Sequence, residues 1–543
     1  MRLQRVSKVV SVAVVAALAL GACGGGSNNA DSAATSTSIT ANGTEPQNPL
    51  LPANTNEVGG GRIMDLLFEG LLSYDADGKT VNEIAESIET TDSQNYTITL
   101  KDGKTFTNGE PVTASSFVDA WNFGAAAKNA QLNSYFFESI KGYDEVSAEG
   151  ATTETMSGLN VVDEKTFTVE LSQPESDWPL RLGYTAFYPL PAKAFEDPAA
   201  FGENPVGNGP YMLAGDNAWQ HEVQIDLVAN PDYTGTRVPQ NTGVTFKFYS
   251  SYDAAYADLQ ADNLDVLDQM PAAAQKTFKS DLVEGRYSEK PTAQNQTITI
   301  PQYLEEFAGE AGALRRQAIS MAVNREEITD VIFSGARQPA NDFTSPVIEG
   351  FNAELPGSEV LAYNPERAKE LWDQAEAISP WPEGKAFTIG YNADGDHKEW
   401  VDAVCNSLKN NLGVDAQGKA YSTFKELRSD ATAKTLSGAI RTGWQADYPS
   451  LYNFLGPLYA TGAGSNDGDY TSQTFDDLLA AGLSAATAEE GAAIFNQAQE
   501  VLLKDLPVIP LWYQVSQTGW SNNVTDVETG WNGVPVYYNI ARK

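Results

Sequence analysis

The segment Arg441-Thr-Gly-Trp-Gln-Ala-Asp447 carries residue types that could hold a ligand with two opposite charges. A carboxylate such as Asp447 makes charge-assisted hydrogen bonds with an ammonium group, and a guanidinium such as Arg441 makes them with a carboxylate. If the segment is a strand, alternate residues from Arg441 to Asp447 share one face, and its ends lie about 20 Å apart at about 3.3 Å per residue. Two other interpretations stay open, a solvated Asp447 at a strand end and a structural ion pair for Arg441.

Residue spacings typical of catalytic sites are missing from the sequence. His221-Glu222 is not followed by a second His at the spacing of a zinc protease, and there is no G-x-S-x-G or G-x-x-x-x-G-K-[ST] motif. Two carboxylates could serve a glycosidase, but with 72 acidic residues an unplaced pair says little. We therefore expect no catalytic residue and keep a surface hydrolase only as a remote alternative.

The composition excludes several classes of protein. The chain has 543 residues and a net charge of −37, which disfavours nucleic acid as a partner because binding phosphates needs a basic surface. Its 22 Phe, 23 Tyr and 10 Trp can build large cores, so disorder is not implied. With two His and two Cys, neither a disulfide framework nor a Cys/His metal site is expected. We expect no metal and no cofactor.

Strands and helices alternate along the chain, which predicts an α/β fold. Residues 96–100 and 167–171 alternate apolar and polar side chains, as half-buried strands do. Thr113 and Asn364-Pro365 look like helix starts. Apolar residues at helical spacing predict further helices, and a short apolar run predicts a strand. These elements cover residues 314–322, 401–412 and 495–502 (helices) and 508–513 (strand).

Cys405 lies on the apolar face of the predicted helix 401–412, which Gly413 closes. A thiol in that position is expected to be buried and inert rather than a nucleophile.

The first residues have the parts of a bacterial export signal. Three basic residues precede an apolar run, Val9–Leu20, that is shorter than the about 20 residues of a membrane-spanning helix. Leu20-Gly21-Ala22-Cys23 follows this run and resembles the lipobox of bacterial lipoproteins, in which the chain is cut before a Cys that becomes lipidated.

The residues after this motif are typical of a tether. Residues 23–42 are rich in small and polar side chains and almost uncharged. We expect 1–22 to be a lipoprotein signal peptide, Cys23 to be lipidated and 23–42 to be flexible. An ordinary secretory signal is the alternative.

Six segments occur in a fixed order between residues 68 and 513. They are Phe68–Leu72 (FEGLL), Tyr96–Ala114 (YTITLKDGKTFTNGEPVTA), Asn204–Tyr211 (NPVGNGPY), Leu314–Arg325 (LRRQAISMAVNR), Gly443–Pro449 (GWQADYP) and Pro507–Tyr513 (PVIPLWY). In this order they resemble the family 5 solute-binding proteins of bacterial ABC importers, the oligopeptide- and dipeptide-binding group. The chain departs from the family at Asn208, at Asn324 and at Ser116, where an acidic residue would strengthen the capping box of Thr113.

The resemblance implies a two-lobed periplasmic-binding-protein fold (type II, cluster C) with an extra domain inserted in the first lobe. The implied first lobe is discontinuous and uses residues 43–67, 173–290 and 513–543. The insert would cover 68–172 and the second lobe 291–512.

The resemblance also implies the roles of individual residues. In oligopeptide-binding relatives the Asp of Trp-x-Ala-Asp-Tyr receives the ligand's α-amino group, which maps onto Asp447. Arg441 can meet the carboxylate of ligands of certain lengths. The backbone of Gly443, Trp444 and Gln445 pairs with the extended peptide.

Other residues are weaker candidates for the same site. Glu57 and Val58 would offer a second pairing edge ahead of a Gly59-Gly60-Gly61 turn. Trp444 could floor a pocket or belong to the core, and Tyr135 could line the site beside two Phe residues.

The implied function is that of a lipid-anchored receptor on the extracytoplasmic face of the cell membrane, not an enzyme. It would deliver di- to oligopeptides to ABC permease subunits that work with a separate ATPase, and we expect a monomer. A non-peptide solute remains the alternative: an oligosaccharide, a metal chelate, haem or glutathione.

Overall fold

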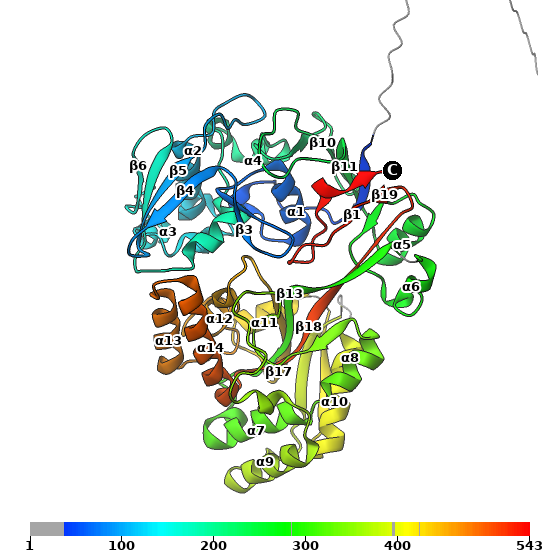
Figure 1. Ribbon diagram of the computed structural model, residues 1–543. Coiled ribbons are helices and arrows are strands. Elements are labelled where there is room, and N and C mark those ends of the chain that lie inside the picture. The colour runs from blue at the N-terminus through cyan, green and yellow to red at the C-terminus, as the bar shows by residue number, and fades with distance from the viewer. Residues whose placement is uncertain (1–36, 284, 394–396, 423) are drawn as a thin grey trace, which may run out of the picture. The chain divides into compact units, whose positions relative to one another are not determined.

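A large mixed sheet of twelve strands runs through the fold (Figure 1). Its strands, in spatial order, are β16 (Ala416–Tyr421), β15 (Phe387–Asn392), β17 (Ala439–Gln445), β13 (Tyr287–Thr299), β18 (Val508–Trp520), β12 (Val266–Leu267), β1 (Ile39–Gly43), β11 (Gly243–Phe248), β10 (Gln224–Ala229) and β8 (Tyr211–Leu213). Two further strands join it from the side, β14 (Arg337–Pro339) on β18 and β9 (Trp219–Gln220) on β10.

The computed structural model describes residues 37–283, 285–393, 397–422 and 424–543. The predicted signal peptide and the lipidation of Cys23 lie outside these residues. Within them, no helix combines the length and apolar character needed to cross a membrane. The C-terminal boundary of the tether predicted for residues 23–42 is wrong, because Ile39–Gly43 form β1, which pairs in parallel with β11.

Two separate hydrophobic cores define the two lobes of the fold. The first lobe packs around a core whose residues lie mostly between Ile39 and Val266, and the second around a core that lies mostly between Ala293 and Trp512. The antiparallel pair β13–β18 connects them, since Ile298 belongs to the second core whereas Trp520 packs against the first. The two-lobed α/β fold expected from the sequence is confirmed; the domain boundaries otherwise stay predictions.

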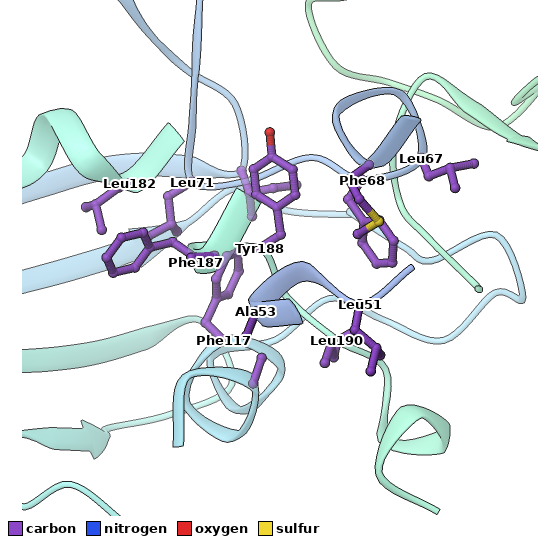
Figure 2. Packing of buried hydrophobic residues seen from close by; sticks show 14 of the residues in the cluster. Leu51, Ala53, Leu67, Phe68, Leu71, Phe117, Leu182, Phe187, Tyr188 and Leu190 are labelled. Carbon is purple, nitrogen blue, oxygen red and sulfur yellow. The ribbon is translucent and has the colours of Figure 1, made fainter. Parts of the chain in front are cut away.

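The segment predicted as an insert shares the core of the first lobe. It carries its own four-stranded sheet, β4 (Ala85–Thr90), β5 (Asn95–Leu100), β7 (Thr166–Glu170) and β6 (Leu159–Val161), and the pair β2 (Leu72–Tyr74) and β3 (Thr80–Asn82). Figure 2 shows Phe117 of this segment close to Phe187 and Ala53, which lie outside it. Because these buried side chains belong to one core, the segment is built into the lobe rather than attached to it.

Helices accompany the strands in both lobes. In the first lobe they are α1 (Val58–Leu67), α2 (Ala114–Ala125), α3 (Tyr143–Ser147), α4 (Pro198–Glu203), α5 (Tyr252–Gln260) and α6 (Phe278–Asp281). In the second lobe they are α7 (Gly309–Ala322), α8 (Arg325–Phe333), α9 (Pro365–Ile378), α10 (Lys398–Leu412), α11 (Phe424–Thr432), α12 (Leu451–Tyr459), α13 (Gln473–Leu483) and α14 (Ala488–Asp505). A short pair, β19 (Val524–Thr525) and β20 (Ala541–Arg542), follows β18.

Local sequence signals place several of these helices correctly. Thr113 and Asn364 are the N-cap residues of α2 and α9, as predicted. Ser116 replaces the acidic residue of the capping box and accepts a hydrogen bond from the Thr113 N–H at 3.1 Å. Cys405 is buried in α10, which Gly413 ends in a left-handed conformation, and burial raises the pKa of its thiol to about 12.

The predicted Gly59-Gly60-Gly61 turn is wrong, because these residues form the first turn of α1. Glu57 is the N-cap residue and its carboxylate accepts from the Gly60 N–H at 2.8 Å. Gly59 has no room for a side chain, since a Cβ there would lie 2.2 Å from Thr44 Oγ1. Close packing, rather than a turn, therefore explains the glycine at this position.

A buried charge cluster joins the predicted insert to the rest of the first lobe. The guanidinium of Arg237 donates to the carbonyls of Asp65 (2.7 Å) and Phe68 (2.8 Å) and lies 3.8 Å from Glu83. Burial, together with its hydrogen bond to Glu83, raises the pKa of Glu69 to about 7. Burial alone would raise the pKa of Glu83, but Glu69 and Arg237 hold it below its ordinary value. Lys104 pairs with Glu69 at 3.2 Å, and Arg237 is the cation that helps to keep Glu83 ionised.

Candidate functional site

Among the described residues, no strand pairs with one backbone edge at the end of β17. Trp444 N–H donates to Asn295 Oδ1 at 3.1 Å and Ala446 N–H to the Ala293 carbonyl at 2.9 Å, so these residues face β13. Gly443 and Gln445 face the other way, because the hydrogen-bonding groups of successive residues alternate along a strand. The neighbour on that side, β15, pairs only up to Ile440 among the described residues. The edge is thus open to an extended chain.

Asp447 lies just beyond this edge and is held by Asn453 of α12. The Asn453 side chain donates to Asp447 Oδ2 at 3.2 Å and accepts from the Asp447 N–H at 3.0 Å. It also accepts from Trp444 Nε1 at 2.9 Å. One buried amide therefore fixes both the carboxylate and the indole.

Three tyrosines of the first lobe lie close enough to the Asp447 carboxylate for its charge to act on them. They are Tyr74, Tyr135 and Tyr184, and the negative charge of Asp447 adds to the burial that raises each of their pKa values. Phe136 lies between two of them, with ring centroids 4.5 Å from Tyr135 and 4.4 Å from Tyr184. Tyr135 is 46% exposed. Aromatic faces beside a carboxylate favour a cation, which both can attract.

Burial raises the pKa of Asp447 to about 6, and hydrogen bonds from Asn453 and Tyr184 offset part of the rise. Among the described residues no Lys or Arg forms an ion pair with this carboxylate. A half-buried carboxylate without a positive partner is costly, and a ligand cation would remove that cost.

Contacts between the lobes lie directly beside Asp447. Ser450 Oγ donates to Asp177 Oδ2 at 2.8 Å, and the guanidinium of Arg181 lies 5.5 Å from the ring centres of both Tyr448 and Tyr452. Arg181 is buried and pairs with Glu175 at 2.8 Å. These contacts hold the segment after β17 against the first lobe.

Arg441 lies in a different cavity, of about 290 Å³, within the second lobe. Its Nε (2.8 Å) and Nη2 (2.6 Å) both donate to Asn392 Oδ1, and the guanidinium stacks 4.8 Å from the ring centre of Phe424. Gly443 and Trp444 line the same cavity. Trp444 also packs against the second core, so it serves both as wall and as core. A role for Arg441 in binding a ligand carboxylate stays a prediction.

Val58 and Gln445 meet in a second cavity, of about 300 Å³. Val58 is 44% exposed and comes from the first lobe, whereas Gln445 belongs to the open edge of β17. The Glu57 carboxylate caps the first turn of α1, and the Glu57 carbonyl accepts a hydrogen bond from the Gly61 N–H at 2.9 Å. Whether Glu57 and Val58 pair with a ligand stays a prediction.

The strand that carries Arg441 ends before Asp447, which corrects the prediction that both share one strand face. β17 ends at Gln445, so the alternation that groups Arg441, Gly443 and Gln445 on one face does not extend to Asp447. Asn453, Tyr74 and Tyr184 were missed in the sequence, and no motif around them signals a site. Within the described residues no three His, Cys, Asp or Glu side chains are placed to hold a metal ion.

Comparison with known sequences gives a consistent result. Residues 79–466 match the family of bacterial extracellular solute-binding proteins, family 5. The chain is 26% identical over 489 residues to the oligopeptide-binding protein OppA of Bacillus subtilis, covering 87% of this chain and 86% of the relative. It is 25% identical over 505 residues to a dipeptide-binding protein of Lactococcus lactis, covering 85% and 86% of the two chains.

Comparison with solved structures gives the same fold. The murein tripeptide binding protein MppA of Escherichia coli superposes with a TM-score of 0.77 at 22% identity, covering 94% of this chain and 99% of the other. Haemophilus influenzae OppA, solved as a complex with RPPGFSPFR, superposes with a TM-score of 0.75 at 23% identity and the same coverage.

Proposed function

The chain belongs to the bacterial extracellular solute-binding proteins of family 5, and from this premise we propose that it binds di- to oligopeptides through their free amino end. The observation that carries the proposal is the Asp447 carboxylate, which is half-buried, lies near three tyrosines and has no cationic partner among the described residues. An α-ammonium group supplies the missing charge. The names of the oligopeptide- and dipeptide-binding relatives support the same ligand class.

The open edge of β17 supports an extended ligand rather than a compact one. Backbone groups of Gly443 and Gln445 can pair with any peptide, since the main chain is common to all sequences. An oligosaccharide or haem would leave both this edge and the Asp447 charge unmatched. The peptide would then pass to ABC permease subunits with a separate ATPase, and lipidated Cys23 would anchor the receptor on the extracytoplasmic face of the membrane.

Mass spectrometry of the ligand that co-purifies with the native protein tests the ligand class. We expect peptides of a few residues with unmodified amino ends in the extract of acid-unfolded protein. Protein that has been unfolded, dialysed and refolded provides the blank. A sugar, haem or metal chelate in place of peptides would contradict the proposal.

Affinity for a free tripeptide should depend on pH in a defined direction. Only ionised Asp447 attracts the ammonium group, and its pKa in the free protein is about 6. Affinity should therefore be constant between about pH 7 and 7.5 and fall up to tenfold per pH unit below about 6. Calorimetric titration between pH 5 and 7.5 measures this. The N-acetylated tripeptide is the control, and a flat profile for the free peptide would contradict the amine assignment.

A further inference from the structure

The cavity of about 300 Å³ that Val58 and Gln445 share has seven side-chain amides among its nineteen lining residues, and we call it the amide-lined cavity. Strands β14, β18, β13 and β17 are neighbours in that order. Arg337 of β14 is paired with Gln514 of β18, and Gln294 of β13 with Gln445 of β17. All four line the cavity, so Arg337 lies about three strand spacings, or about 14 Å, from the edge proposed to bind the peptide.

The charges around this cavity do not cancel. Its charged lining residues, among those described, are Arg62, Asp268 and Arg337. Arg62 Nη2 and Asp268 Oδ2 form an ion pair at 2.8 Å. No carboxylate of the described residues forms an ion pair with Arg337, so the cavity keeps one uncompensated positive charge.

The residues that the structure describes leave most of the hydrogen-bonding capacity of Arg337 unused. Nη1 donates to the carbonyl of Ala336 at 2.6 Å and, more weakly, to that of Val515 at 3.4 Å. The guanidinium carbon lies 5.1 Å from the ring centre of Phe333, a cation–π contact. A guanidinium has five N–H donors in a fork that matches a carboxylate. Burial lowers the pKa of Arg337 to about 10, so the group is still charged at neutral pH.

We propose that Arg337 binds a carboxylate of the ligand in the amide-lined cavity, so that the receptor selects peptides carrying an anionic group there. This inference rests on the proposed peptide function. Amide N–H groups of Gln294 and Gln514 can supply further donors to the same anion. The carboxylate is either the C-terminal group of the peptide or an acidic side chain, since both have the same chemistry.

Arg441 is the other arginine available for this task, and its environment differs. Two of its nitrogens donate to Asn392 Oδ1, and its guanidinium carbon lies 4.8 Å from the ring centre of Phe424. Among the described residues, Arg337 has only backbone carbonyls as hydrogen-bond partners, and it shares a cavity with Gln445 of the open edge. If Arg337 binds the ligand carboxylate, Arg337→Gln should remove carboxylate recognition; if Arg441 binds it, Arg441→Gln should do so.

Calorimetric titration of the full-length protein with a defined peptide panel tests the inference. The panel holds alanine peptides of two to five residues as free acids and as C-terminal carboxamides, and carboxamides with one Glu or one Gln at each position. In wild type at least one acid–amide or Glu–Gln pair should differ about 10- to 100-fold in affinity. Arg337→Gln should abolish that difference while leaving affinity for the uncharged member within about twofold.

Two further variants serve as controls. Arg337→Lys keeps the charge without the fork and should retain part of the preference. Arg367→Gln, an exposed residue paired with Glu370 on α9, should behave as wild type. Unchanged binding of the carboxamides shows that Arg337→Gln is folded. A preference lost between free acids and carboxamides identifies the C-terminal carboxylate, and one lost between Glu and Gln peptides identifies a side-chain carboxylate.

Some outcomes would overturn the inference. A preference that persists in Arg337→Gln, or that disappears in Arg441→Gln instead, would assign the carboxylate elsewhere. Equal affinity for both members of every pair in wild type would show that no carboxylate is selected. If no peptide binds wild type, the peptide function fails and this inference fails with it, whereas peptides that bind independently of Arg337 overturn this inference alone.

Discussion

Replacing Asp447 with Asn should lower the affinity for a free tripeptide by about 100- to 1000-fold, or about 3–4 kcal/mol. The substitution keeps the size and the hydrogen bond with Asn453 but removes the only negative partner proposed for the ligand's ammonium group. The ammonium would then be desolvated among Tyr74, Tyr135 and Tyr184 without compensation. Calorimetric titration of purified variant and wild type at pH 7.5 measures the loss.

The N-acetylated tripeptide separates this mechanism from general damage to the site. It lacks the charge, so its affinity should be nearly the same for wild type and Asp447→Asn. Asp477→Asn, on the exposed face of α13, is the matched control and should change neither affinity. Equal losses for both peptides, or no loss for either, would show that Asp447 is not the amine anchor.

Ligand-free Asp447→Asn should unfold at a higher temperature than wild type at pH 7.5, which also excludes misfolding as the reason for lost binding. The pKa of Asp447 is raised in the folded state, so folding favours the protonated form, and that contribution is lost as the pH rises through about 6. The Asn variant stays uncharged throughout. Its advantage should therefore disappear at pH 4.5.

Replacing Arg237 with Met should lower the free energy of unfolding by about 3–5 kcal/mol, the range expected when one partner of a buried charge cluster is removed. Arg237 is 4% exposed and Glu83 is fully buried. The variant would leave Glu83 without its cation and the carbonyls of Asp65 and Phe68 without a donor. Urea denaturation followed by tryptophan fluorescence measures the loss.

The pH dependence of that loss identifies its cause. Without Arg237 the pKa of Glu83 should rise above its value in the unfolded chain, so the variant should regain stability at low pH and lose it as the pH rises. We therefore expect a larger difference from wild type at pH 8 than at pH 5.5. Adding Glu83→Gln should restore part of the stability at pH 8, and Arg367→Met is the exposed control. A loss that is independent of pH would point to packing rather than charge.

Sequence patterns predicted the parts of the fold that depend on near neighbours. Thr113 and Asn364 mark their helices because an N-cap is a local event. The strand before Asp447 was also predicted, but its end at Gln445 was not, since the turn that follows depends on how Ala446 pairs with Ala293, more than a hundred residues earlier in the chain.

The candidate site was only partly visible in the sequence for the same reason. The motif indicated Asp447, but Tyr74 and Tyr184 approach it from the other lobe. Asn453 binds Asp447 through its side-chain amide, and the sequence does not distinguish it from other polar residues of a helix. Arg337 is distinguished by the lack of an acidic neighbour among the described residues. The sequence contains 72 acidic residues, and only the folded structure shows that none of the described ones forms an ion pair with Arg337.

The arrangement of strands in the large sheet also sets the order in which the lobes can be completed. β1, close to the start of the described chain, lies between β11 and β12, and β12 needs β18 as its other neighbour. Arg542 then donates to the Ser38 carbonyl and to Asp265, each at 2.9 Å. Contacts so distant in sequence form slowly. When the chain becomes available from its N-terminus onward, the lobe whose residues come first is therefore finished last, while the second lobe can begin to pack its nearly continuous core before β19 and β20 are available.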